Sequence, residues 1–160
     1  MTANVFLVPC DPGNFDRTVL SQVNLTEISK TPDPIADLTS VRFWGARDGE
    51  RNKNYFEKMN RGDLVLFYQD GAYVGIGNVG RTFVDEEKWA STTFWQNAPS
   101  KLIYTIEEFT ELSIPRGAVN RLFDYGPDYY PQGLTRVADN RVSNTVRTIR
   151  RALEMYNEKH

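Results

Sequence analysis

A tight-turn signal between two apolar segments in the middle of the chain is the feature that most constrains the fold. Asp70-Gly71 separates residues 64–68, which read LVLFY, from residues 73–79, which read YVGIGNV. An Asp-Gly pair favours the positive φ angles of a two-residue hairpin turn, and both flanking segments are rich in strand-forming residues. The sequence therefore predicts an antiparallel hairpin over residues 64–79.

A short helix is predicted immediately before this hairpin. Tyr55, Phe56 and Met59 fall at i, i+1 and i+4, which places them on one face of a helix over residues 54–59. A Gly-Asp pair at residues 62–63 then ends the helix and turns the chain. Together these segments predict a small β-structure with a helix packed at its rim.

Patterns elsewhere in the chain predict the remaining elements. Apolar segments predict strands over residues 4–9, 102–109 and 134–137. Helices are predicted around residues 15–23 and 119–123, and a loop over residues 29–34, where two prolines oppose a helix. The last helix is predicted from an N-cap and an apolar stripe at i, i+4, i+7 and i+11: Asp139, then Val142, Val146, Ile149 and Leu153.

A glycine pattern in the second half of the hairpin does not indicate a nucleotide cofactor. Gly75, Gly77 and Gly80 spell G-x-G-x-x-G, but the dinucleotide fingerprint requires these glycines to leave a strand and open a helix. Here they lie inside a predicted strand, and the following residues 81–84 are also strand-forming. Glycines inside a strand instead favour a bend or a close approach of two backbones.

The chemistry of most enzymes has little support in this sequence. The only histidine, His160, is the last residue, and the only cysteine, Cys10, has no histidine to activate it and cannot form an internal disulfide. Neighbouring carboxylates such as Glu107 and Glu108 point apart on a strand, so they form neither a metal site nor a catalytic pair. We expect a non-enzymatic protein without a metal or cofactor.

Length and composition fit one domain with a buried core. The chain has 160 residues, of which 40% are hydrophobic and 25% are charged. It contains no apolar run near the ~20 residues that a membrane span needs and no basic segment before its first apolar run. The expectation is a single domain over residues 1–160 in a cytoplasmic protein, without a membrane partner.

Basic residues gather in the central segment although the formal net charge is −2. A local basic face on a mildly acidic protein suits the recognition of one nucleic-acid site better than the coating of a long one. The candidate phosphate-binding residues are Arg42, Arg47, Arg51, Lys53 and Lys58. For each of them a solvated surface position is the alternative.

The same central segment resembles the EVE branch of the PUA-like superfamily. The resemblance rests on Tyr55-Phe56, Met59, Gly62-Asp63 and the LVLFY strand, followed by a glycine-rich strand. Related YTH domains, and the similar N-terminal domains of McrB-type restriction proteins, bind nucleic acid by extruding a modified base into an aromatic cage. The resemblance thus implies an α+β fold: a small, twisted, barrel-like sheet of five or six strands with about three packed helices.

The resemblance also implies which aromatic residues would form the cage. Trp44 stands at the start of a polar loop, as a cage tryptophan does in YTH domains, and this position favours a partly exposed side chain over one packed in the core. Trp89 matches the second cage aromatic, which follows the glycine-rich strand. Trp95 is its rival, and Phe94 is a candidate third wall.

Polar residues near these aromatics are candidates for contacts with a base edge. Asp11 and Asn14 occupy the place of the polar loop that leaves the first strand in YTH and EVE domains, although turn formation and helix capping are commoner roles for both. Gly45 is a third candidate, beside Trp44. Asn52 and Asn54 are further candidates, because an amide can both accept from and donate to a base edge; a helix N-cap is the alternative role of Asn54.

The resemblance therefore implies a domain that flips a modified base, a methylated adenine or cytosine, with DNA favoured over RNA as the ligand. Such a domain would recognise the target for a modification-dependent restriction system whose nuclease or motor lies on another domain or subunit. Two alternatives stay open at this stage. One is an RNA-binding PUA-like or YTH-like module, and the other is a domain that binds a small ligand or a protein through the aromatic cleft.

Overall fold

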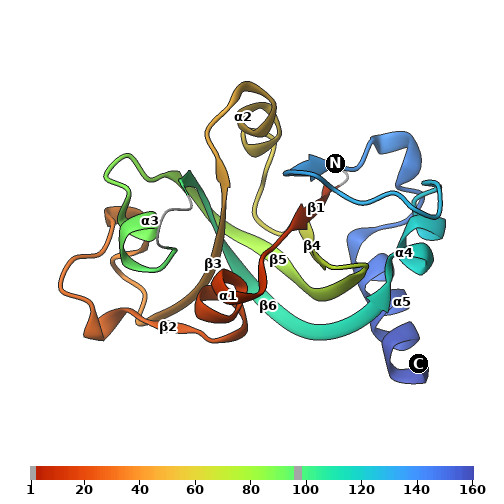
Figure 1. The fold of residues 1–160 in the computed structure, drawn as a ribbon, viewed down its shortest axis with the longest axis horizontal. Helices are drawn as coiled ribbons and strands as arrows, with labels where there is room; N and C mark the ends of the chain where they lie inside the picture. Colours follow the sequence, from red (N-terminus) through yellow and green to blue (C-terminus); the bar gives the residue numbers. More distant parts are fainter. Residues whose placement is uncertain (1–2, 96–98) are drawn as a thin grey trace.

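The computed structural model describes residues 3–95 and 99–160, which form one α+β domain (Figure 1). A mixed sheet has the strand order β2-β3-β6-β5-β4-β1-β7. Its strands are β1 (Val5–Pro9), β2 (Val23–Asn24), β3 (Ser40–Arg47), β4 (Leu64–Gln69), β5 (Ala72–Val84), β6 (Ser100–Pro115) and β7 (Thr135–Arg136). The α-helices of the described residues are α1 (Pro12–Phe15), α2 (Glu50–Phe56), α3 (Trp89–Thr93), α4 (Arg116–Leu122) and α5 (Val146–Lys159).

The predicted fold class is confirmed, but the sheet has seven strands rather than five or six. The difference comes from β2 and β7, which are two residues long each and therefore too short to leave a periodic signal in the sequence. Short helical turns, again too brief to predict, supplement the α-helices: a π-type turn at Asp16–Leu20 and 3₁₀ turns at Leu25–Glu27, Asp33–Ile35 and Asp139–Arg141.

The central hairpin forms as predicted. Strands β4 and β5 pair antiparallel from Leu64 with Asn78 to Gln69 with Ala72. Asp70 and Gly71 connect them with φ angles of 48° and 89°, in the left-handed region that an Asp-Gly turn requires. The predicted first strand is also confirmed: β1 pairs parallel to β4, in register from Val5 with Leu64.

The paired strands β5 and β6 form one long ladder that curves across the molecule. Their register shifts at three places, and Glu108 adopts a φ of 51° within β6. Gly75 lies in β5, as the sequence predicted, at a close approach: a Cβ added to it would lie 2.6 Å from Phe109 Cε1. Figure 1 shows the resulting curve of β5 and β6, with β1 and β3 crossing in front.

Two hydrophobic clusters lie on the two faces of this curved sheet. Alternation along β4 directs Val65 and Phe67 into one cluster, with α1 and β3, and Leu64 and Leu66 into the other, with α4 and α5. Helix α5 is also fastened by Arg150, which donates to Asn78 Oδ1 at 2.7 Å and to the Glu108 carbonyl.

Helix boundaries are where the structure departs from the sequence prediction. Helix α2 begins after Gly49, so Asn54 lies inside the helix rather than at its N-cap. Helix α5 begins after Thr145, whose hydroxyl accepts from Thr148 N at 3.2 Å. Asp139 instead opens a 3₁₀ turn, and Val142 precedes the helix. A cap depends on local backbone geometry, and several polar residues near each helix start satisfy the same sequence rule.

The helix predicted over residues 15–23 starts earlier and ends earlier, and the one over 119–123 is longer. Helix α1 and the following π-type turn together run from Pro12 to Leu20. Helix α4 begins at Arg116, immediately after the strand β6 ends. Within residues 3–95 and 99–160, no helix has both the length and the apolar character needed to cross a membrane.

The buried carboxylate of Asp63 ties the N-terminal strand to the central hairpin. It accepts hydrogen bonds from Asn4 N at 2.9 Å, Asn4 Nδ2 at 3.0 Å and Asn60 N at 2.8 Å. Only 1% of Asp63 is exposed, so the carboxylate depends on these protein donors rather than on water for its hydrogen bonds.

Replacement of this carboxylate tests its role in stability. Asp63→Ala should lower the free energy of unfolding by about 2–4 kcal/mol, because it removes the common acceptor of three hydrogen bonds whose donors are partly buried. Urea unfolding measures the change. Asp128→Ala, at a side chain that is 93% exposed, is the control and should stay within about 0.5 kcal/mol of the parent protein. Equal effects of both substitutions would contradict the assignment.

Candidate functional site

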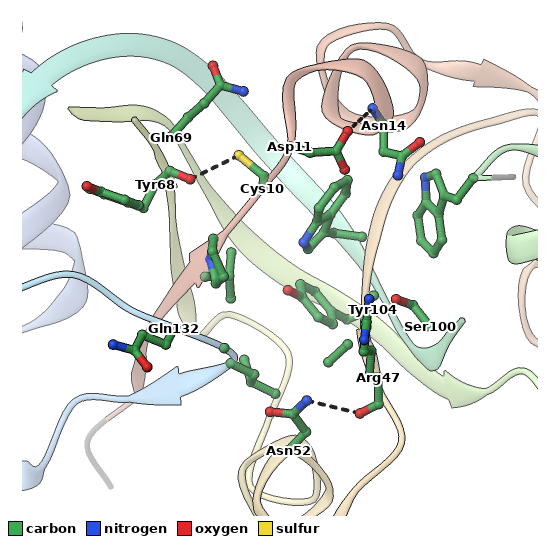
Figure 2. A pocket seen from close by; sticks show the side chains of 18 of the residues that line it. Cys10, Asp11, Asn14, Arg47, Asn52, Tyr68, Gln69, Ser100, Tyr104 and Gln132 are labelled. Carbon is green, nitrogen blue, oxygen red and sulfur yellow. Dashed lines mark hydrogen bonds between the residues drawn. The ribbon is translucent and has the colours of Figure 1, made fainter. Parts of the chain in front are cut away.

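A cavity of about 490 Å³ opens where β1 and β3 diverge (Figure 2). The two strands pair with other neighbours, β1 with β4 and β7 and β3 with β2 and β6, so a gap remains between them. The lining comes from five segments that are distant in the sequence: residues 8–11 with 14, 44–47 with 52, 68–70, 95 with 100 and 104, and 132–134.

Three aromatic side chains form the rigid part of the lining. Trp44, Trp95 and Tyr104 are 8%, 2% and 1% exposed. The rings of Trp44 and Trp95 lie 5.5 Å apart at 62°, and Trp95 Nε1 donates to Thr18 Oγ1 at 3.3 Å. The sequence predicted a partly exposed Trp44, and this prediction is wrong: the side chain is buried, because surrounding aromatic rings enclose it on the strand β3.

Gly45 lets the aromatic rings approach the strand closely. A Cβ at this position would lie 2.8 Å from Ile103 Cδ1, which is shorter than real Cβ contacts, and 3.0 Å from Trp95 Cζ3, which is tighter than most of them. A side chain here would displace Trp95 or distort the pairing of Gly45 with Ile103. Glycine thus permits the close packing of Trp95 and Ile103 against β3 beside the cavity.

Polar residues from α1 line one side of the cavity. Asp11 caps α1 and accepts from Asn14 N at 3.0 Å through Oδ2, so the predicted capping role is confirmed. Arg17 donates to Asn14 Oδ1 at 2.7 Å, which orients the amide. Capping and cavity lining are compatible, because each carboxylate oxygen can accept more than one hydrogen bond.

The opposite side is lined by α2 and by residues 132–134. Asn52 Nδ2 donates to the carbonyl of Arg47, the last residue of β3, at 3.0 Å. Its Oδ1 faces Gly133, where a Cβ would lie 3.5 Å away. Figure 2 shows Asp11 and Asn14 at one end of the view and Asn52 at the other, with the hydroxyl of Tyr104 directed between them.

Two buried ionisable groups of the lining, Cys10 and Tyr104, are neutral at physiological pH. Burial raises the pKa of the Cys10 thiol from 9.0 to about 12, and the carboxylates of Asp11 and Asp16 add to the shift. Burial also raises the pKa of Tyr104 well above its usual value. Charged side chains line only the more exposed parts: Asp11, Asp70 and Arg47.

The structure brings part of the predicted site together and leaves part of it elsewhere. Trp44, Trp95, Gly45, Asp11, Asn14 and Arg47 all line the cavity. Trp89 and Phe94 do not: their rings pack on each other at 5.3 Å and on Phe43 at 5.4 and 5.5 Å. Asn54 is exposed on α2 and is also outside the lining.

Trp89 is held in its own helix rather than at the cavity. Asp85 accepts hydrogen bonds from Trp89 N at 3.0 Å and Ala90 N at 2.8 Å, which fixes the start of α3. Trp89 is then buried against β3, and this packing directs Trp95, six residues later, to the cavity instead.

Of the five candidate phosphate-binding residues, one is bonded inside the protein and four are accessible at its surface. Arg42 is used internally: it donates to the Val19 and Leu20 carbonyls and lies over the Phe109 ring at 5.0 Å. Its assignment to phosphate binding is therefore corrected. The other four, Arg47, Arg51, Lys53 and Lys58, are at least partly exposed at the end of β3 and along or just after α2.

Sequence analysis missed Tyr104 and Cys10 as lining residues, whereas Asn52, a candidate for a base-edge contact, does line the cavity. Tyr104 lies in a predicted strand, whose alternation shows that it is inward but not which cavity it reaches. Cys10 lies next to the predicted candidate Asp11, so a short window around Asp11 would have included it.

Comparison with known proteins identifies the fold. No family model matches the chain, and neither does any curated protein. Solved structures are similar, however. The N-terminal domain of McrB from Thermococcus gammatolerans, bound to m5C DNA, is 22% identical with a TM-score of 0.73, over 94% of this chain and 99% of that one.

The second similar structure is more distant. Human THYN1 protein, in complex with DNA that contains 5-methylcytosine, is 10% identical with a TM-score of 0.52, over 87% of this chain and 93% of that one. At these identities the similarity shows the fold alone. The expected resemblance to McrB-type N-terminal domains is thus confirmed as a shared fold.

The raised pKa of Cys10 predicts slow alkylation. A pKa of about 12 in place of 9.0 lowers the thiolate fraction at pH 8 about 10³-fold, and the thiolate is the reactive form. Iodoacetamide should therefore modify the folded protein far more slowly than the urea-unfolded protein, as mass spectrometry measures. Similar rates in both states would show that Cys10 is neither buried nor neutral.

Proposed function

We propose that this domain binds DNA containing a modified base and holds that base, extruded from the duplex, in the cavity between β1 and β3. The observation that carries the proposal is a cavity with three fixed aromatic rings and polar groups around them. It lies in a chain that shares its fold with a domain solved on m5C DNA.

The cavity offers the two kinds of contact that an extruded base needs. Stacking on an aromatic ring contributes about 1–3 kcal/mol per base, and Trp44, which is 8% exposed against 2% for Trp95 and 1% for Tyr104, is the lining ring with the most surface open to a ligand. The Asp11 carboxylate is an acceptor for an exocyclic amino group, and the Asn14 amide supplies a donor. These contacts would offset the cost of removing the base from the stack.

A methylated cytosine is the first candidate for this base. An aspartate carboxylate is suited to accept from N4 of cytosine, and both similar structures contain methylcytosine DNA. Methylated adenine is the second candidate, because its exocyclic amino group is also a donor and an asparagine such as Asn14 suits its base edge.

The charges around the cavity suggest how the DNA backbone runs. Arg47, Arg51, Lys53 and Lys58 lie on the α2 side and would contact phosphates. Asp11 and Asp70 line the other side, where a phosphate would be repelled. The backbone contacts would position the duplex without reading its sequence.

In this proposal the domain itself is not an enzyme. It would recognise the target for a modification-dependent restriction system, and the nuclease or motor would belong to another domain or subunit. The shared fold with a McrB N-terminal domain supports this role. Among the described residues no cluster of histidine, cysteine or carboxylate side chains is suited to hold a metal.

Loss of one cavity ring should reduce modification-dependent binding. Trp44→Leu should weaken binding to a duplex with one 5-methylcytosine by roughly 5- to 150-fold, the value of one stacking interaction, without an equal loss for unmodified duplex. Fluorescence anisotropy at fixed salt measures both, with matching RNA as a further ligand.

The control for this substitution is Trp89→Phe, at a tryptophan outside the cavity. It should leave the ratio of modified to unmodified binding unchanged. Melting temperatures of both variants check that the fold survives. Binding that does not depend on the modification in the parent protein would refute the proposed function, and tighter binding to the matching RNA would support an RNA reader.

Phosphate contacts on α2 should appear in the salt dependence. Replacing Arg51 and Lys53 together by alanine should weaken binding to modified and unmodified duplexes alike. The slope of log affinity against log salt should fall by about 0.9 for each phosphate that is no longer neutralised. Lys30→Ala, at a residue that pairs with Glu87 at 3.3 Å, is the control. An unchanged slope in the double variant would place the phosphates elsewhere.

A further inference from the structure

The strand β5 has an open edge where it runs past the end of β4. Pairing with β4 covers β5 as far as Asn78, and the backbone of Val79 bonds to Gly62 and Asp63 just beyond it. Residues 80–84 continue the strand with β6 on one side, and Figure 1 shows this end of β5 near α3. Among residues 3–95 and 99–160, no strand pairs with the other side of this segment.

The backbone groups at this edge point outward in the alternation that an added strand requires. Asp85 N donates to the Lys101 carbonyl at 2.7 Å, and Phe83 lies opposite Ile103 in the same register. Residues 83 and 85 therefore turn their N–H and C=O groups toward β6. In an antiparallel pair the intervening residues turn theirs the other way, so those of Thr82 and Val84 face the open edge.

The loop over residues 28–37 protects only the first part of this edge. Arg81 donates to the Pro34 carbonyl at 3.0 Å and to Asp37 Oδ2 at 3.0 Å, which fastens the loop beside Arg81. Thr82 is exposed, and Val84 is 44% exposed. Proteins usually cover or charge a strand edge, because its unpaired backbone groups attract another chain. An exposed valine at an uncovered edge is therefore a feature of a contact surface.

A groove of about 740 Å³ adjoins the uncovered part of the edge and includes Val84 in its lining. The apolar part of the lining also contains Ile28, Pro32, Pro34, Phe83 and Trp89. The charged part consists of four carboxylates and two lysines: Asp33, Asp85, Glu86 and Glu87, with Lys30 and Lys88. This excess of negative charge favours a cationic ligand and repels DNA. No residue of the groove lines the cavity between β1 and β3.

From these observations we infer that the open edge of β5 and its groove bind an extended, basic segment of another protein. The segment adds to the sheet as a strand beside Thr82 and Val84. Backbone hydrogen bonds supply the affinity, and alternate apolar side chains enter the groove, as strand addition requires. Its basic side chains meet the carboxylates of Glu86 and Glu87. The inference concerns a different surface from the base cavity and does not depend on the proposed function.

The probe for this surface is a hexapeptide of alternating lysine and valine, acetylated and amidated at its ends. Titration into isotope-labelled protein gives the dissociation constant by NMR, and amide hydrogen exchange locates the peptide. Saturating peptide should slow exchange of the Thr82 and Val84 amides at least about tenfold, because each N–H gains an acceptor. The same peptide with glutamate in place of lysine should bind at least about tenfold more weakly, because the groove is acidic.

A substitution at Val84 tests whether backbone pairing is the cause. Val84→Pro removes the N–H that an added strand needs, and proline is tolerated there because that N–H does not face β6. The variant should bind the lysine peptide at least about tenfold more weakly. The matched control is Val84→Thr, which keeps the N–H and the strand preference and should stay within about threefold of the parent. Melting temperatures check that both variants fold.

A second pair of substitutions tests the charge and leaves the strand edge intact. Glu86→Gln combined with Glu87→Gln should weaken binding of the lysine peptide about threefold or more at low salt, and less at high salt. The matched control is Glu57→Gln combined with Glu158→Gln, at exposed carboxylates outside the groove, which should leave the affinity unchanged. This comparison tests the inference even where Val84→Pro fails to fold.

The outcomes distinguish this inference from its alternatives. Protection of Thr82 and Val84 that Val84→Pro loses and Val84→Thr keeps would support it. Absence of binding, binding without protection of these amides, or equal binding of the lysine and glutamate peptides would overturn it. A dimer of the parent protein that Val84→Pro abolishes would also overturn it, because a second copy would then occupy the edge. Trp44→Leu should leave peptide binding unchanged, so failure of the proposed function is seen separately.

Discussion

The bend of the β5–β6 ladder is the constraint on which the rest of the structure depends. A flat ladder of 13 and 16 residues would bring the strands β1 and β3 to a common plane, whereas three register shifts curve it so that they diverge. Gly75 permits the curve because its lack of a side chain lets Phe109 approach the backbone. The cavity is thus a consequence of the curvature, and the loops around it only complete its walls.

Inside that cavity, rigidity and neutrality favour recognition of a neutral, planar ligand. Trp95 is fixed by its hydrogen bond to Thr18, which itself donates to the Phe43 carbonyl at 2.8 Å. Rings that are already fixed lose little conformational entropy when a ligand binds. Because Cys10 and Tyr104 stay protonated, the interior contains hydrogen-bonding groups without formal charge, and the charged side chains remain near the solvent.

Sequence patterns predicted the parts of this fold that depend on local chemistry. The Asp70-Gly71 turn, the first strand and the strand position of Gly75 follow from turn geometry and alternation, and all three were correct. The choice between Trp89 and Trp95 was not accessible, because both stand in similar polar surroundings and only the packing of α3 decides which one reaches the cavity. Arg42 was mistaken for a surface cation because its acceptors, the carbonyls of residues 19 and 20, are distant in the sequence.

The cavity is assembled from five segments that span the chain from residue 8 to residue 134. No single hairpin or helix contains enough of the lining to bind a ligand alone, so the affinity belongs to the completely folded state. Ligand binding and global unfolding are therefore thermodynamically linked: a ligand at 100 times its dissociation constant would stabilise the whole domain by about 2.7 kcal/mol. A substitution far from the cavity can accordingly weaken ligand binding simply by reducing the population of folded molecules. For the same reason, the melting temperature of the domain should rise with the fraction of cavities that hold a ligand.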